Sequence, residues 1–201
     1  PVKVEETAPR IVKVAAFASE LMNVGPMAAV PGTLAELGVE VMIHEGGLVN
    51  LIENGGEISA LSLKPINVGI YAARSPLSGK IGFHLSRDDF PIGIATSSAT
   101  VSHALSFGEA DAVVIIADSA AIADAAATAV CNSVKGDDCE ASVQSGLELA
   151  ETLPYVRGAL IIRGKYAGVV GRLPQLVKFD GSVDDIFRAS LHETFPDKRF
   201  L

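Results

Sequence analysis

The feature that most constrains the fold is an unbroken apolar run at residues 112–117, followed closely by an alanine-rich segment at residues 119–134. Consecutive apolar residues between polar turns predict a strand that is buried on both faces, which requires a packed layer on each side. The alanine-rich segment, which Asp118 or Ser119 can cap, predicts a helix. Its small side chains allow another backbone to approach closely. The pair therefore predicts a layered structure of strands and helices.

Composition supports this interpretation. The chain has 201 residues, of which 49% are hydrophobic and 20% charged, and it contains no Trp. A chain of this size can bury a full core without disulfides. We therefore expect a single domain over residues 1–201, built as one unit or as two closely packed lobes.

Periodicity and turn residues predict an α+β fold in which antiparallel or mixed sheets are flanked by helices. The predicted helices are residues 11–22, 27–37, 119–134, 140–151 and 182–194, with Gly38 as the cap of the second. The predicted strands are residues 39–43, 48–53, 57–63, 66–72, 80–85, 92–95, 112–117, 159–163 and 167–170. Those between residues 39 and 85 are expected to form an antiparallel meander, and Gly164-Lys165 a hairpin turn.

The charge of the chain limits its partners. A net charge of -8 and a pI near 5.0 disfavour nucleic acid and anionic lipid, because binding to phosphate backbones depends on Lys and Arg. The first residues lack the pattern of a signal peptide, and acidic residues interrupt the most apolar stretch, residues 110–134. The two cysteines, Cys131 and Cys139, are too few for a disulfide framework. We expect a cytoplasmic protein that binds neither nucleic acid nor a membrane.

The first candidate site is the pair Asp124 and Thr128 in the alanine-rich helix. Their spacing places both oxygens on one helical face, one turn apart. Mg²⁺ prefers such oxygen ligands, together with water and a substrate phosphate. The alternative is a hydrogen-bonded Asp–Thr pair on the solvent face of a packing helix, and spacing alone favours it.

The second candidate is a strand that leads into hydroxyl side chains: Thr96, Ser97 and Ser98, with His103 a few residues later. Loop amides and hydroxyls after a strand can bind phosphate without positive side chains. A more specific alternative is a Ser-His-Asp hydrolase with Asp111 as the acid. The segment lacks the G-x-S-x-G motif that forms the nucleophile elbow of such enzymes. His103 alone is as readily explained as a core imidazole.

The third candidate is the segment Asn54, Gly55, Gly56 and Glu57 between two predicted strands. The glycines suit a tight hairpin, and this is a sufficient explanation. They would also let a flat ring or a pyrophosphate approach the backbone. The similar-looking segment at residues 75–80 lacks the first glycine of a phosphate-binding loop, because position 74 is Arg74, and we interpret it as a turn.

In this order, the motifs resemble the ApbE superfamily. They are Gly25-Pro26-Met27-Ala28-Ala29 with Gly32 and Glu36, then Glu53-Asn54-Gly55-Gly56-Glu57, Ala95-Thr96-Ser97-Ser98, His103, and Ala123-Asp124-Ala125 with Thr128. The best-known members are Mg²⁺-dependent FAD:protein FMN transferases, and this chain is most similar to an uncharacterised stand-alone branch. The resemblance implies an ApbE-like, T-fold-like architecture.

The resemblance also implies roles for individual residues. Asp124 and Thr128 would be the side-chain metal ligands, and a main-chain carbonyl between residues 28 and 31 would complete the site. Asn54 to Glu57 and Thr96 to Ser98 would flank FAD or FMN, and His103 would be a general base. We therefore expect a small-molecule nucleotide as partner; a homodimer is an assembly to be tested.

Two departures from the transferase pattern limit the implied activity. The pattern Ala-Lys-Gly is Val30-Pro31-Gly32 here, and the element His-x-x-Asp-Pro shrinks to His103-Ala104-Leu105-Ser106. Nucleotide and Mg²⁺ binding are therefore expected to persist, with pyrophosphate cleavage or FMN transfer reduced or lost. The alternative is a non-catalytic or thiol-based accessory protein in sulfur metabolism, because Cys131 would lie on the same helical face as Asp124 and Thr128.

Overall fold

The computed structural model describes residues 3–100 and 107–179. Its helices are α1 (Arg10–Leu21), the short 3₁₀ helix η1 (Pro26–Ala29), α2 (Val30–His44), η2 (Arg87–Asp89), α3 (Ala120–Ser133) and α4 (Cys139–Thr152). Its strands are β1 (Val49–Asn54), β2 (Glu57–Ser62), β3 (Ile66–Gly69), β4 (Ile81–Leu85), β5 (Ile92–Ser97), β6 (Ala112–Ala117), β7 (Val156–Arg163), β8 (Tyr166–Gly171) and β9 (Gln175–Lys178).

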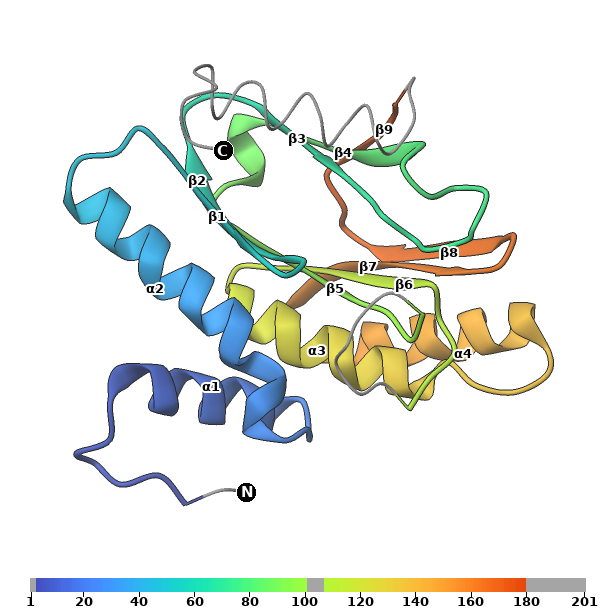
Figure 1. Cartoon of the computed structure of the whole chain (residues 1–201), viewed down its shortest axis with the longest axis horizontal. Coiled ribbons are helices and arrows are strands. Elements are labelled where there is room, and N and C mark those ends of the chain that lie inside the picture. Colours follow the sequence, from blue (N-terminus) through green and yellow to red (C-terminus); the bar gives the residue numbers. More distant parts are fainter. Residues whose placement is uncertain (1–2, 101–106, 180–201) are drawn as a thin grey trace, which may run out of the picture.

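These elements form layers around a six-stranded antiparallel sheet with the order β1-β2-β5-β6-β7-β8. Helices cover one face, and the three-stranded sheet β3-β4-β9 lies over the other (Figure 1). The central strand β6 is buried along its whole length. The expected α+β class, with antiparallel sheets flanked by helices, is confirmed.

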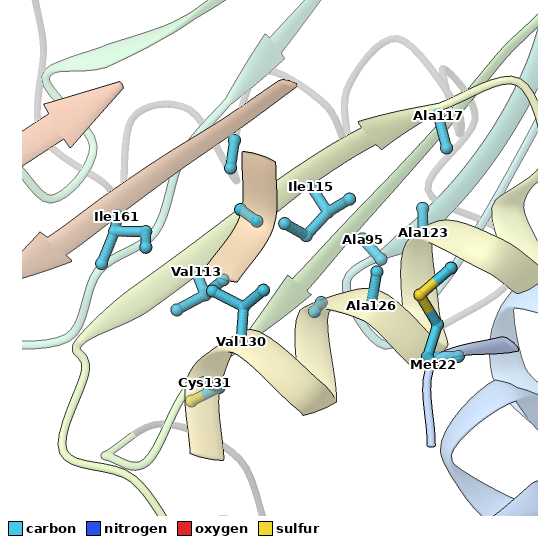
Figure 2. Packing of buried hydrophobic residues seen from close by; sticks show 14 of the residues in the cluster. Met22, Ala95, Val113, Ile115, Ala117, Ala123, Ala126, Val130, Cys131 and Ile161 are labelled. Atoms are coloured by element: carbon cyan, nitrogen blue, oxygen red, sulfur yellow. The ribbon is translucent and has the colours of Figure 1, made fainter. Parts of the chain in front are cut away.

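Two hydrophobic clusters separate the layers. On the helical side, the alanines of α3 pack against Ala95, Val113, Ile115 and Ile161 of the sheet (Figure 2). On the other side, Phe83 and Leu85 of β4 pack against alternate residues of the same strands, among them Ile94 and Val114. Because side chains alternate along a strand, this division tells which face of the sheet each residue of β2 and β5 occupies.

The predicted helices α1, α3 and α4 and both tight hairpins are present. Ser119 caps α3 by accepting a hydrogen bond from the Ile122 amide, and Asp138 caps α4. Residues 75–80 form a turn, as expected. The tail helix predicted at residues 182–194 lies outside the described residues.

The strand predicted at residues 39–43 is wrong, because this segment is the C-terminal half of α2. We interpreted Gly38 as a helix cap, but it lies inside the helix. A Cβ at Gly38 would lie 2.4 Å from the Cδ1 atom of Ile52 in β1. Gly38 therefore serves close helix–sheet packing. Of the β-branched residues that continue the helix, Val39 is buried, whereas Val41 and Ile43 are exposed.

The continuous meander is also wrong. After the β1–β2 hairpin, the chain leaves the large sheet to form β3 and β4, and then β5 returns to pair with β2. The small sheet is completed by β9, which the sequence did not predict. Pairing partners that are distant in sequence decide this topology.

One stretch, Pro26–His44, is long and apolar enough to match the composition of a membrane span, and it covers η1 and α2. In the folded chain, Gly32, Thr33, Ala35 and Val39 of α2 are buried. Length and composition of this kind also occur in core helices and in signal sequences.

Candidate functional site

Asp124 lies in the middle of α3, 6% exposed, and is held by the start of α2. Its Oδ2 atom accepts a hydrogen bond of 2.8 Å from the backbone N–H of Gly32. The carbonyl of the same peptide group, that of Pro31, accepts a hydrogen bond of 3.2 Å from Nδ2 of Asn54. A single peptide unit therefore connects the end of β1 to the acidic side chain of α3.

This connection requires α2 and α3 to lie unusually close. A Cβ at Gly32 would lie 2.3 Å from the carbonyl oxygen of Ala120 and 2.8 Å from the Cβ of Asp124. One turn further along α2, the Glu36 carboxylate accepts hydrogen bonds from the Ser119 hydroxyl and the Ala121 N–H at the start of α3. The two helices thus hold Asp124 in a fixed position.

Glu57 faces the same side of the sheet as Asp124. It is the first residue of β2, directly opposite Asn54, and its neighbour Ile58 points into the core on the other side. Side chains alternate along a strand and opposite residues share a face, so Asn54 and Glu57 both point toward the helices. Glu57 is 9% exposed.

Burial dominates the electrostatics of these acids. It raises the pKa of Asp124 to about 7, while the hydrogen bond from Gly32 opposes the shift. Burial, with a further contribution from the charge of Asp124, raises the pKa of Glu57 to about 8. Both carboxyl groups therefore resist ionisation unless a cation compensates them.

The remaining predicted residues fall on different faces. Thr128 is half-buried one turn after Asp124, as the spacing predicts. Ser97 follows Ala95 on the helical side, whereas Thr96 follows Ile94 and points to the opposite side of the sheet. The structure thus brings Asn54, Glu57 and Ser97 to the face of Asp124, and it separates the side chain of Thr96 from them.

The glycine turn closes the β1–β2 hairpin beside β5. Gly55 and Gly56 have positive φ angles of 76° and 111°, and the Gly56 N–H donates to the Glu53 carboxylate. A Cβ at Gly56 would lie 3.5 Å from the carbonyl oxygen of Thr96. The turn therefore lies next to the Ser/Thr segment, as expected, and the hairpin geometry accounts for both glycines.

Ser98 is buried, and its hydroxyl accepts a hydrogen bond from the Thr100 N–H. Asp111, the acid of the hydrolase alternative, accepts hydrogen bonds from the Thr100 hydroxyl and the Gly164 N–H. Both side chains thus serve local structure. His103 lies outside the described residues.

Cys131 is fully buried in the cluster between α3 and the sheet (Figure 2). Two cavities, of about 320 and 440 Å³, run along α1, and no residue of the predicted site lines them. The cavities are therefore separate from the predicted site, and the thiol has no contact with solvent.

The donor set around Asp124 fits a hard cation. Glu57 is electrostatically coupled to Asp124, and Thr128 lies one turn after Asp124 on the same helix, so the candidate ligands on these three side chains are oxygen atoms. Within residues 3–100 and 107–179, no group of three or more His, Cys, Asp or Glu side chains is placed to hold a metal. One or two carboxylates completed by hydroxyl, water and phosphate oxygens is the pattern of Mg²⁺, and it is unlike the nitrogen and sulfur ligands of Zn²⁺.

Sequence reasoning placed the segment Asn54 to Glu57 beside the Asp124 helix, but it missed the hydrogen bond from the Gly32 N–H to Asp124 and the electrostatic coupling of Glu57 to Asp124. The signal for the first was the glycine after the proline, at a point where no turn was expected. The second had no local signal, because it depends on which face β2 turns toward α3.

This chain is similar in sequence to one protein family and to individual archaeal proteins. The family described as AbpE bacteria matches residues 1–151. A UPF0280 protein of Methanocaldococcus jannaschii is 43% identical over 195 residues, covering 93% of this chain and 78% of that protein. A UPF0280 protein of Methanococcus aeolicus is 44% identical over 197 residues, covering 97% and 78%.

Among solved structures, the apo form of the Pseudomonas stutzeri flavinyl transferase ApbE is similar with a TM-score of 0.49 and 16% sequence identity, covering 80% of this chain and 68% of that one. The family match spans most of the chain, and the UPF0280 relatives share more than two fifths of its residues. This chain therefore belongs to the AbpE bacteria family, the ApbE-like group that its motifs resemble.

Proposed function

We propose that this protein binds a flavin nucleotide, FAD or FMN, together with Mg²⁺, and that its capacity to transfer FMN to other proteins is reduced or lost. The protein would act in the cytoplasm on a small-molecule nucleotide, without a nucleic acid or membrane partner. Cleavage of FAD by water to FMN and AMP is the reaction that such a site could retain.

The observation that carries the proposal is the state of Asp124. It is buried, one of its oxygens is fixed by the Gly32 N–H, and the other accepts no hydrogen bond within the described residues. A buried carboxylate with a free oxygen is costly unless a cation binds it. Thr128, one turn away on the same helix, has no hydrogen bond from its hydroxyl among the described residues and can supply a second oxygen.

The charges of the protein make nucleotide binding depend on the cation. Three arginines are engaged in ion pairs elsewhere: Arg10 with Glu40, Arg157 with Asp118 and Arg163 with Glu109. These three side chains are therefore not free to neutralise a phosphate beside Asp124 and Glu57. When bound, Mg²⁺ would offset the charge on the phosphate oxygens.

Transfer to an acceptor protein needs more than nucleotide binding. The acceptor hydroxyl must be activated and its segment admitted to the site. Position 31, where the transferase pattern has Lys, is Pro31, and its carbonyl is bonded to Asn54. The Asp-Pro element is likewise replaced by Leu105-Ser106. A barrier higher by about 4 kcal/mol slows a reaction about a thousandfold.

The test is a titration of FAD fluorescence with the full chain, with and without Mg²⁺. The native protein is expected to bind FAD only with Mg²⁺, and Asp124→Asn is expected to weaken binding at least tenfold at unchanged thermal stability. Asp137→Asn, a change at an exposed position between α3 and α4, is the matched control. Absence of Mg²⁺-dependent binding by the native protein would refute the proposal.

Incubation with FAD, Mg²⁺ and an acceptor peptide, followed by mass spectrometry, separates binding from transfer. We expect no FMN adduct on the peptide. An adduct formed at an enzymatic rate would show that the loss of Lys and Asp-Pro does not limit transfer. Release of FMN and AMP without an adduct would identify the protein as a hydrolase.

The thiol-based alternative loses its main support, because Cys131 is fully buried. A thiol without solvent contact is an inert part of the core. Native alkylation with iodoacetamide is expected to leave Cys131 unmodified, and peptide mass spectrometry can distinguish it from the half-buried Cys139.

A further inference from the structure

We infer that Glu57 is a second carboxylate ligand of the cation held at Asp124, so that the protein binds the cation before a nucleotide arrives. This inference rests on the proposed function, because it concerns the same site. The sequence alone placed Glu57 beside the flavin nucleotide. The geometry assigns it to the cation instead.

Backbone connections place Glu57 near Asp124. Glu57 is opposite Asn54 in the β1–β2 hairpin, and Asn54 is bonded to the Pro31–Gly32 peptide whose N–H binds Asp124. Further along the same face of the sheet, Ser59 of β2 is paired with Gly93 of β5. A Cβ at Gly93 would lie 2.4 Å from the backbone nitrogen of Ala120. This face of β2 and β5 therefore packs directly against the first turns of α3, and Glu57 continues it.

Burial shows that the two carboxylates lack a natural compensation. Glu57 and Asp124 are 9% and 6% exposed. The only donor to the Glu57 carboxylate among the described residues is its own backbone N–H, and the one bond to Asp124 leaves an oxygen without a donor there. An ordinary protein interior avoids two such groups on one face unless they are neutralised. The arrangement is therefore suited to a cation that touches both.

Two carboxylates also allow the cation to bind before the nucleotide. A site with one carboxylate carries a single negative charge and needs a phosphate to complete it. Asp124 and Glu57 together neutralise a divalent cation, with Thr128 and water filling further positions.

The experiment measures binding of Mn²⁺, a spectroscopic substitute for Mg²⁺, to the full chain without nucleotide, by the loss of the free-ion paramagnetic resonance signal. Glu57→Gln is expected to weaken Mn²⁺ binding at least tenfold. Glu57→Asp, which keeps the charge at a shorter reach, is expected to restore part of it. Glu53→Gln is the matched control in the same hairpin, because Glu53 is exposed and lies on the opposite face.

The outcomes separate this inference from the proposed function. If the native protein and Glu57→Gln bind Mn²⁺ equally while Asp124→Asn does not, Glu57 is no ligand and the proposed function stands. If the native protein binds no Mn²⁺ without nucleotide but binds FAD with Mg²⁺, the inference alone fails. If neither cation nor FAD binds, the proposed function fails as well. Equal losses in Glu53→Gln and Glu57→Gln would indicate a general charge effect and overturn the inference.

Discussion

At the scale of single residues, burial of Glu57 and Asp124 determines how the metal-free protein responds to pH. The pKa of Glu57 is raised from 4.5 to about 8 and that of Asp124 from 3.8 to about 7, in both cases mainly by burial. A raised pKa means that the folded state retains protons that the unfolded state releases. Stability is therefore highest below the unfolded values and declines as pH rises from about 4 to 8.

We predict that chemical denaturation in a chelating buffer will show a free energy of unfolding that decreases between pH 5 and pH 9, by roughly 1.4 kcal/mol for each unit of pKa shift at most. Glu57→Gln is expected to flatten this decrease and to stabilise the metal-free protein at pH 9. Glu53→Gln should flatten the slope much less, because the charge of Glu53 makes the smallest contribution to the raised pKa of Glu57. A native slope in Glu57→Gln would mean that the carboxyl group is not buried in solution.

At the scale of elements, the two glycines of α2, Gly32 and Gly38, have different structural roles. A Cβ at Gly32 would collide with the backbone of Ala120, whereas a Cβ at Gly38 would meet the end of the flexible side chain of Ile52. The first contact holds two helices and the Gly32–Asp124 hydrogen bond together. The second adjusts the packing of α2 on β1.

We predict that Gly32→Ala destabilises the protein by about 1–3 kcal/mol and weakens Mn²⁺ binding, because backbone cannot move aside as a side chain can. Gly38→Ala in the same helix is expected to be close to neutral, because the helix propensity of Ala, worth about 1 kcal/mol, offsets the movement of Ile52. Urea titrations compare the two. Equal effects would contradict the close α2–α3 contact.

At the scale of the whole molecule, the candidate site joins three segments that are far apart in the chain. The start of α2, the β1–β2 hairpin and the middle of α3 meet through the Pro31–Gly32 peptide. The opposite end of the sheet, with α4, β7 and β8, has no part in it (Figure 1). Ligand binding should therefore stabilise one end of the fold.

We predict that FAD with Mg²⁺ will slow amide hydrogen exchange together at residues 30–34, 54–58 and 122–129, and will leave residues 139–152 and 166–171 unchanged. The physical reason is that a ligand that bridges the three segments suppresses their local opening. Mass spectrometry of peptides measures this. Protection confined to the peptides that line the two cavities along α1 would show that the ligand binds there instead.

Local patterns were enough for much of this structure. The apolar run of β6, the caps of α3 and α4 and the glycine turn after Asn54 are set by neighbours in the chain, so each could be predicted. The same holds for Asp124 and Thr128, because helical spacing alone places them on one face. The error at residues 39–43 shows the limit, since a glycine that caps a helix and one that packs inside it look alike in sequence.

The sequence by itself determined the α+β class, most elements, the family resemblance and the placement of Asp124 and Thr128 on one face of α3. Only the tertiary structure decided that Glu57 joins Asp124, that Thr96 points away from it, and that Cys131 is sealed in the core. These facts depend on strand register and on the approach of α2 to α3, which are fixed by contacts between residues remote in the chain. Burial and charge at the site arise from those contacts, and no local pattern encodes them.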